Sequence, residues 1–436
     1  MKMICGLLIL LLTIPLAAQD FFSTLDEQTT DDRPYELNGF IRGAYFAGRG
    51  IDEDNIEQKS GYGEMGLKMR VRKADWGDGY AEIRFRKGHE FQESISEVDV
   101  REAYVNTYFG NFDVRMGHQI VVWGRADGFN PTNNITPQNM LVRSSVEDDR
   151  KIGNFLFRAN YNLHPLRFEA IWVPQYRSSV LPIQLFPFPD YVELAPEELP
   201  DADIANSSFA LRLNFQFNII DGSLSYFQGF MPLPGVAFKS LEVQDTGFRA
   251  LVANKPYRMN VFGGDFSTTI GSFGLRGEVA FRQPINDYKN PVNVFIPNPD
   301  IQGVFGIDRT YGDFSVILQY IGRYVIDFQP FQDTGFPTDQ LILNNRMISS
   351  QLYEINHAVF IRPALTLFHE TMDIEALVYY NVDTEEALFR PLLSKDITDA
   401  LTFKLGADWY VGPENTLFGN IDRALSSAFV EFVAFF

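Results

Sequence analysis

The chain has 436 residues, of which 45% are hydrophobic and 14% aromatic, with 40 Phe and 19 Tyr. Charged residues make up 21%, which excludes a wholly disordered chain. Beyond the N-terminal segment no apolar run approaches the ~18 residues of a spanning helix, which excludes a helical membrane bundle. The formal net charge of −19 excludes the electrostatics of a typical nucleic-acid-binding protein, and the Phe and Tyr surplus favours β-strands.

The N-terminus has the organisation of a secretory signal peptide over residues 1–18. A positive residue precedes an apolar run, and the small residues Ala17 and Ala18 provide a cleavage site. The only cysteine of the sequence lies in this segment, so the mature chain would have neither disulfides nor free thiols. We expect a flexible periplasmic lead-in over residues 19–36 and a single transmembrane β-barrel domain over residues 37–436.

Segments in which apolar and polar residues alternate recur along the whole chain, and this is the period of a β-strand. From Phe112 to Met116, for example, apolar side chains alternate with Asp113 and Arg115. The same alternation predicts strands over residues 64–72, 81–87, 112–119, 155–162, 209–218, 273–282 and 401–411. Weaker alternation predicts further strands over residues 355–368, 373–382 and 386–395.

The connections between these segments alternate between short and long. Short connections occur at residues 75–78, 110–111, 164–165, 221–222, 271–272 and 312–313. Long connections occur near residues 49–60, 124–153, 175–206, 232–256, 283–300 and 326–350. A soluble β-sandwich also has alternating strands, but transmembrane barrels have tight turns at one rim and long loops at the other. We therefore predict an all-β fold, a closed antiparallel transmembrane β-barrel of about 18 strands (about 16 as the alternative), with short periplasmic turns and long extracellular loops.

The C-terminal segment alternates up to its last residue, Phe436. An aromatic C-terminus on an alternating final strand is typical of outer-membrane barrels, and we expect it to be recognised by the barrel-insertion machinery. Two predicted strands contain an internal proline, Pro363 or Pro391, which lacks the N–H donor that a paired strand needs.

Three short stretches share a pattern with known proteins: residues 101–105 (REAYV), 115–124 (RMGHQIVVWG) and 130–131 (NP). A further match covers residues 397–402 (ITDALT) and 405–408 (LGAD). In these motifs the chain resembles a family of uncharacterised, porin-like outer-membrane β-barrels that is grouped as a domain of unknown function. The resemblance implies a barrel in the cell outer membrane that acts as a channel. It implies no established substrate and no catalytic residue.

The polar faces of the predicted strands are rich in arginine. A charged side chain facing lipid at mid-depth costs about 2–4 kcal/mol, so we expect these side chains to face the lumen. The predicted pore-lining residues are Arg70, Arg72, Glu82, Arg84, Arg86, Arg115, Gln119, Arg158, Arg212, Arg276 and Arg282. One interpretation is a basic lining that selects small polar or anionic solutes. The other is that the arginines pair with nearby glutamates and brace the wall.

The long connection that follows Trp123 is the candidate for a constriction. Trp123 is expected to end a strand, and Gly124 allows a sharp turn. If the connection folds inward, the charged and amide side chains of Arg125, Asp127 and Asn130 would narrow the lumen. The alternative is an ordinary external loop with a tryptophan at the membrane rim.

These patterns favour a passive, porin-like channel in the cell outer membrane, reached through the cleaved signal peptide. The alternative is a plugged barrel that acts through its long extracellular loops as an adhesin, a receptor or part of a transport or secretion complex. The histidines lack metal-ligand spacing and no G-x-S-x-G motif occurs, so we expect no enzyme, no metal and no cofactor. The expected partners are outer-membrane lipid and the insertion machinery, with a homo-oligomer as a possibility and no nucleic acid.

Overall fold

The computed structural model describes residues 34–436 apart from 51–53, 73–75, 183–190, 245–246 and 336. The expected signal peptide, residues 1–18, and nearly all of the lead-in therefore lie outside the described residues. The first strand begins at Tyr35.

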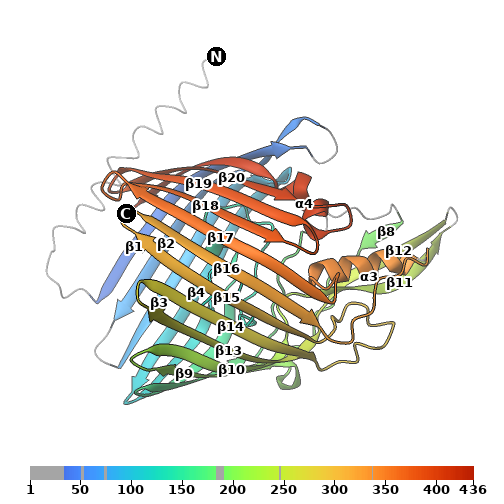
Figure 1. The fold of residues 1–436 in the computed structure, drawn as a ribbon, viewed down its shortest axis with the longest axis horizontal. Coiled ribbons are helices and arrows are strands. Elements are labelled where there is room, and N and C mark those ends of the chain that lie inside the picture. Colours follow the sequence, from blue (N-terminus) through green and yellow to red (C-terminus); the bar gives the residue numbers. More distant parts are fainter. Residues whose placement is uncertain (1–33, 51–53, 73–75, 183–190, 245–246, 336) are drawn as a thin grey trace.

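An 18-stranded antiparallel sheet closes into a barrel, which confirms the predicted fold and the larger of the two strand counts (Figure 1). The barrel strands are β1 (Tyr35–Arg49), β2 (Ile56–Arg72), β3 (Gly77–Glu90), β4 (Glu93–Phe109), β5 (Phe112–Gln119), β6 (Asn154–Leu163), β7 (Leu166–Val173), β9 (Ser208–Gln216), β10 (Ile220–Phe230), β13 (Arg258–Ile270), β14 (Phe273–Pro284), β15 (Asp300–Tyr311), β16 (Phe314–Val325), β17 (Ile355–Leu367), β18 (Met372–Asn381), β19 (Glu386–Thr398), β20 (Leu401–Val411) and β21 (Ser427–Phe435). Every segment that alternation marked as a strand overlaps one of these elements.

The two ends of the chain close the barrel. β1 pairs with both β2 and β21, and the pairing with β21 runs from Phe40–Phe435 to Ala47–Ala428. The N–H of Phe436 continues the ladder by donating to the carbonyl of Gly39 at 3.1 Å. The barrel sheet thus has no unpaired edge strand. A sheet in the hydrocarbon layer needs this closure, because its backbone N–H and C=O groups cannot bond to water there.

One rim carries short turns and the other carries nearly all the long connections (Figure 1). Gly110, Gly271 and Gly312 each begin a two-residue turn at φ near +60°, a conformation that glycine adopts without strain. The expected alternation misses two short connections on the long-loop rim. β3 and β4 are joined by residues 91–92, and β18 and β19 by residues 382–385.

The faces of the wall are inverted relative to a soluble protein. Outward side chains such as Ile41, Val279 and Trp409 are exposed by 51–61%. Inward groups such as Glu431 and Asp300 are 0% exposed. An apolar exterior around a polar interior is stable where the surroundings are acyl chains, and a soluble sandwich would have the opposite pattern.

The two prolines are accommodated within the barrel wall. Pro363 in β17 pairs in register with Val316 of β16, whereas the β17–β18 register skips it. Pro391 in β19 pairs with Ala376 of β18, whereas the β19–β20 register skips it. Each proline thus interrupts the ladder on one side only, the side where its missing N–H would have donated.

Additional elements cover the long-loop rim. A small sheet is made of β8 (Val192–Leu194), β11 (Gly235–Gln244) and β12 (Gly247–Lys255), and α3 (Pro337–Ile348) packs beside β11 (Figure 1). A second helix, α4 (Leu417–Leu425), contacts β20 and β1. None of the helices in the described parts of the chain is long and apolar enough to cross a membrane.

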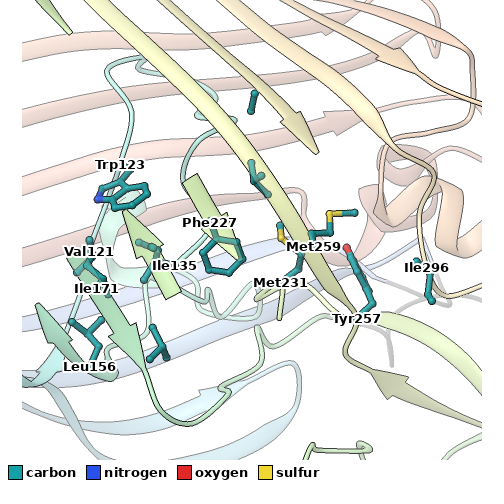
Figure 2. Packing of buried hydrophobic residues seen from close by; sticks show 14 of the residues in the cluster. Val121, Trp123, Ile135, Leu156, Ile171, Phe227, Met231, Tyr257, Met259 and Ile296 are labelled. Carbon is teal, nitrogen blue, oxygen red and sulfur yellow. The ribbon is translucent and has the colours of Figure 1, made fainter. Parts of the chain in front are cut away.

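The largest apolar cluster lies inside the barrel (Figure 2). Val121, Trp123 and Ile135, from the connection between β5 and β6, pack against inward side chains of the wall that include Leu156 and Met259. Both Leu156 and Met259 are fully buried. Burying an aliphatic side chain contributes about 1.5–3 kcal/mol, so this cluster is a strong attachment of the connection to the wall.

Candidate functional site

The connection between β5 and β6, residues 120–153, folds into the barrel, and we call it the inward loop. Just beyond the last β4–β5 pair, the N–H of Ile120 donates to the Glu102 carboxylate at 2.9 Å. The chain then turns at Gly124, whose φ of +100° is in the left-handed region. A Cβ at Gly124 would lie 2.6 Å from the carboxylate of Glu278, so the turn needs a glycine.

Glu278 on β14 fastens the turn of the inward loop. Its carboxylate accepts hydrogen bonds from the N–H of Arg125 at 3.1 Å and from both the N–H and the hydroxyl of Thr132 at 2.8 Å. Only 4% of Glu278 is exposed. A buried carboxylate that accepts several donors forms stronger hydrogen bonds than a neutral acceptor would, and here it joins both sides of the turn to one strand.

The tip of the turn reaches across the lumen to further strands. Arg125 pairs with Asp265 of β13 at 2.7 Å, and Asp127 pairs with Arg276 of β14 at 2.9 Å. The N–H of Gly128 donates to the side-chain carbonyl of Gln319 on β16 at 2.9 Å. Residues 120–137, the first limb of the inward loop, therefore lie along the wall formed by β6 to β16.

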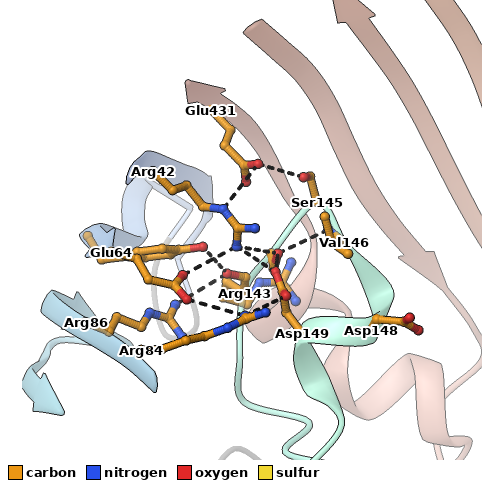
Figure 3. Close-up of polar contacts among 12 residues, drawn as sticks. Arg42, Glu64, Arg84, Arg86, Arg143, Ser145, Val146, Asp148, Asp149 and Glu431 are labelled. Carbon is orange, nitrogen blue, oxygen red and sulfur yellow. Dashed lines mark hydrogen bonds and ion pairs between the residues drawn. The ribbon is translucent and has the colours of Figure 1, made fainter. Parts of the chain in front are cut away.

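Residues 138–153, the second limb, are held by buried ion pairs (Figure 3). Asp149 lies in a short 3-10 helix, Glu147–Arg150, and accepts from Arg42 of β1 at 2.6 Å and from Arg84 of β3 at 2.7 Å. Burial alone would raise the pKa of Asp149, but the charges of Arg42 and Arg84 lower it well below its usual range. Asp149 is therefore ionised throughout the physiological range.

Arg143 fastens the second limb to β20, which is two strands away from β1 in the wall. Its side chain is 1% exposed and donates to Asp408 of β20 at 2.8 Å and to the carbonyl of Leu425 at 2.7 Å. Two residues further on, the hydroxyl of Ser145 donates to Glu431 of β21 at 2.9 Å. The second limb thus lies along a continuous part of the wall that runs from β3 through β2, β1 and β21 to β20.

A cavity of about 430 Å³ remains between the second limb and the wall formed by β17 to β20. The wall contributes the cations Arg362, Arg390 and Lys404 and the carboxylates Asp373 and Glu375, and the loop contributes Glu147 and Asp148. Glu147 lies 3.4 Å from Arg362 and 3.3 Å from Arg390. The acidic groups are the more accessible, because the side chains of Glu147 and Asp148 are 45% and 69% exposed while that of Arg390 is 7% exposed.

Besides the exposed Arg72, six of the predicted pore-lining arginines form ion pairs with carboxylates. They are Arg84 with Glu82, Arg86 with Glu90, Arg158 with Glu169, Arg212 with Asp265, Arg276 with Asp127 and Asp308, and Arg282 with Asp300. Most of these carboxylates are buried, Asp300 and Asp265 almost completely. This pairing is what a bracing role requires, and it offsets much of the positive charge that a basic lining would present.

The remaining predicted pore-lining residues have neutral partners, except Arg72, whose partner is exposed. Arg70 lies 5.7 Å from the ring of Tyr80, Arg115 donates to Asn106 at 2.6 Å, and the exposed Arg72 is 4.0 Å from Glu36. Gln119 is fully buried and donates to the carbonyl of Leu156 at 2.9 Å. The prediction that Trp123 ends a strand is wrong, because β5 ends at Gln119 and Trp123 is buried in the apolar cluster. The backbone carbonyl of Asn130 accepts from the N–H of Asn133.

Several charged residues of the lumen had no signal in the sequence. Arg143 and Asp149 lie in a connection without periodicity, so no pattern relates them to Asp408 or Arg42. Arg390 lies within the weakly alternating segment 386–395, directly before Pro391, and the weak alternation did not indicate its inward orientation. No group of three or more His, Cys, Asp or Glu in the described residues is arranged to hold a metal ion.

The geometry defines a class of protein: a closed 18-stranded barrel whose lumen contains a long, charged inward loop. A family model described as a protein of unknown function (DUF1302) matches residues 31–329, more than half of the chain, so the chain belongs to this family. This confirms the family resemblance expected from the sequence. No curated protein matches the sequence.

Solved structures resemble the chain over nearly its whole length. OccAB2 of Acinetobacter baumannii has a TM-score of 0.54 at 9% identity, covering 92% of this chain and 98% of that chain. OpdQ of Pseudomonas aeruginosa has a TM-score of 0.53 at 8% identity, covering 93% and 98%. OpdK of the same organism, described as an outer membrane protein, has a TM-score of 0.52 at 10% identity, covering 92% and 98%. At such identities the likeness shows a shared fold.

Proposed function

We propose that the protein is a passive channel of the cell outer membrane, through which small polar solutes diffuse past the inward loop. The observation that carries the proposal is the cavity of about 430 Å³ between the second limb and the wall, lined by charges of both signs. Charged side chains that face each other across a narrow passage favour solutes that carry polar groups. The apolar exterior of the barrel supports a lipid environment, and the strand ending at Phe436 is our candidate for recognition by the insertion machinery.

The proposed selectivity is weak, because the arginines of the lumen are largely paired. We propose that Arg362 attracts anionic groups while Glu147 and Asp148 attract cationic groups at the same cavity. A solute with separated charges, or a neutral polar solute, would then pass more readily than a strongly charged ion.

Planar-bilayer recording of the purified barrel tests this proposal. We expect a stable conductance whose reversal potential in a salt gradient is small. Glu147→Gln is expected to shift the reversal potential toward anion preference, and Arg362→Gln toward cation preference, because each removes one charge from the same cavity. A barrel without conductance at any voltage, or two variants that shift it in the same direction, would contradict a channel at this site.

The second candidate is a plugged barrel that acts as a receptor or adhesin through its long extracellular connections. The ion pairs that hold the second limb against the inner wall favour it, because a firmly held loop can close a pore. Under this alternative the purified protein would not conduct, and a variant that releases the second limb would open it.

A further inference from the structure

A second cavity, of about 380 Å³, lies at the long-loop rim, outside the lumen passage. It is formed by the connection between β14 and β15, by α3 and by the start of β11. Its volume is within the range of small-molecule sites, about 300–1,000 Å³. Its lining is mainly apolar and aromatic and includes Tyr257, Tyr288, Phe295, Phe328 and Ile342.

One cation lines this cavity without a counterion. Arg346, in the last turn of α3, has an Nη1 atom that is buried and has no hydrogen-bond partner among the described residues. No carboxylate of the described residues forms an ion pair with it, and its guanidinium carbon lies over the ring of Phe328, 5.5 Å from the ring centroid. Burial lowers the pKa of the Arg346 guanidinium, and no neighbouring charge offsets that shift.

Several deeply buried arginines of this protein have the carboxylate partner that Arg346 lacks. Arg282 has Asp300 and Arg143 has Asp408. At the rim of the same cavity Lys289 is paired with Asp327 at 2.9 Å, and Asp327 also accepts from the hydroxyl of Tyr288. An uncompensated, partly buried guanidinium is costly, so a position that keeps one is a candidate for a site that a ligand completes.

The element that carries Arg346 is held rigidly. The preceding residue, Asn345, is buried and bonds both backbone groups of Val236 on β11: its side-chain carbonyl accepts from the N–H and its amide donates to the carbonyl, each at 2.8 Å. Met347, on the other side, is 1% exposed. The backbone position from which the Arg346 side chain projects is therefore fixed before any ligand arrives, which reduces the entropy that binding would cost.

We propose that this cavity binds a small organic anion, with its carboxylate on the Arg346 guanidinium and its apolar body against the aromatic lining. A single planar guanidinium matches a carboxylate, which it can bind through two parallel hydrogen bonds. Asn290 and Asn298, which also line the cavity, are neutral amides. A dianion would therefore leave its second charge without a cation, so the site fits a monoanion better. The site is separate from the passage, and binding to it does not require that the barrel conducts.

Equilibrium binding to the purified full-length protein in detergent tests the proposal. The probes are phenylacetate, phenylpropionate and phenylbutyrate, each compared with its neutral amide by titration calorimetry. We expect saturable binding of at least one acid and binding of its amide that is weaker by about tenfold or more, the effect of a charge-assisted hydrogen bond. Equal binding of acid and amide, or no binding of any acid, would overturn the proposal.

Three variants locate the site. Arg346→Gln is expected to abolish the preference for the acid over the amide, whereas Arg249→Gln, an equal charge change at the ion pair with Glu193, should leave binding unchanged. Arg346→Met removes the uncompensated charge and keeps the apolar stem, so its thermal midpoint should equal or exceed that of the wild type. Acid binding that survives in Arg346→Gln would refute the site, and a large loss of stability in Arg346→Met would assign Arg346 a structural role instead. Bilayer conductance of the same variants should be unchanged, which separates this proposal from that of the channel.

Discussion

The two limbs of the inward loop are attached to the same wall by different physical means. The first limb, residues 120–137, has ion pairs at its tip and Glu278 at its turn, but its main attachment is the apolar packing of Val121, Trp123 and Ile135. The second limb, residues 138–153, is held by ion pairs in which Asp149 is central. Apolar packing is insensitive to pH and salt, whereas an ion pair depends on both partners being present and charged. The first limb is therefore the permanent part of the constriction, and the second limb is the part that a single charge can release.

The largest effect is expected for Trp123→Ala in the first limb. The indole is 2% exposed, and truncating a buried tryptophan costs about 3–5 kcal/mol because a cavity remains. Urea unfolding in detergent or lipid should show this loss of stability. If the inward loop detaches before the wall unfolds, the loss cannot exceed the free energy with which the loop binds the wall. The neighbouring Val122→Ala, at a side chain that is 40% exposed, is the control and should change stability by no more than about 0.5 kcal/mol. Similar losses in both variants would refute apolar packing as the attachment.

The second-largest loss of stability is expected for Asp149→Asn in the second limb. Removing this charge leaves Arg42 and Arg84 with less compensation, but both keep contacts to Glu64, so we expect a loss near the low end of the range for a broken buried pair, about 3 kcal/mol. Conductance should increase or become noisy as the limb detaches. Asp148→Asn, at an adjacent side chain that is 69% exposed, is the matched control and should leave stability unchanged. A quiet, wild-type conductance in Asp149→Asn would show that the limb is held by other contacts.

A smaller effect is expected at the tip of the first limb. A Cβ at Gly128 would lie 2.6 Å from the ring of Phe360, which is 2% exposed and has little room to move. Gly128→Ala should therefore cost about 1–3 kcal/mol by overpacking. Gly303→Ala, where the nearest atom to an added Cβ is the carbonyl of Glu278 at 3.8 Å, is the control. Thermal unfolding that is equal for the two variants would show that the tip does not rest on β17.

The wall could be predicted from the sequence because its periodicity is local. In β14, apolar residues alternate with Arg276, Glu278 and Arg282, and this pattern alone assigns each side chain to a face. The turn at Gly124 was also expected, because a glycine after a strand is a local signal. The partners across the lumen could not be predicted, since Arg143 and Asp408 are far apart in the chain and no period relates them. The helix α3 was also missed, because the connection that contains it was expected only to be long.

Lowering the pH is expected to give the smallest effect that distinguishes the two limbs. Because its neighbours lower the pKa of Asp149 below that of an unfolded aspartate, the stabilisation is complete above the unfolded value of about 3.9 and is lost as pH falls from there toward the folded value. The conductance of the wild type should thus be constant from about pH 7 to pH 4 and change only below it. Asp149→Asn should lack this acid transition, while Trp123→Ala should retain it. An acid transition of equal size in Asp149→Asn would assign the titration to another carboxylate of the lumen and break the distinction between an apolar first limb and an ionic second limb.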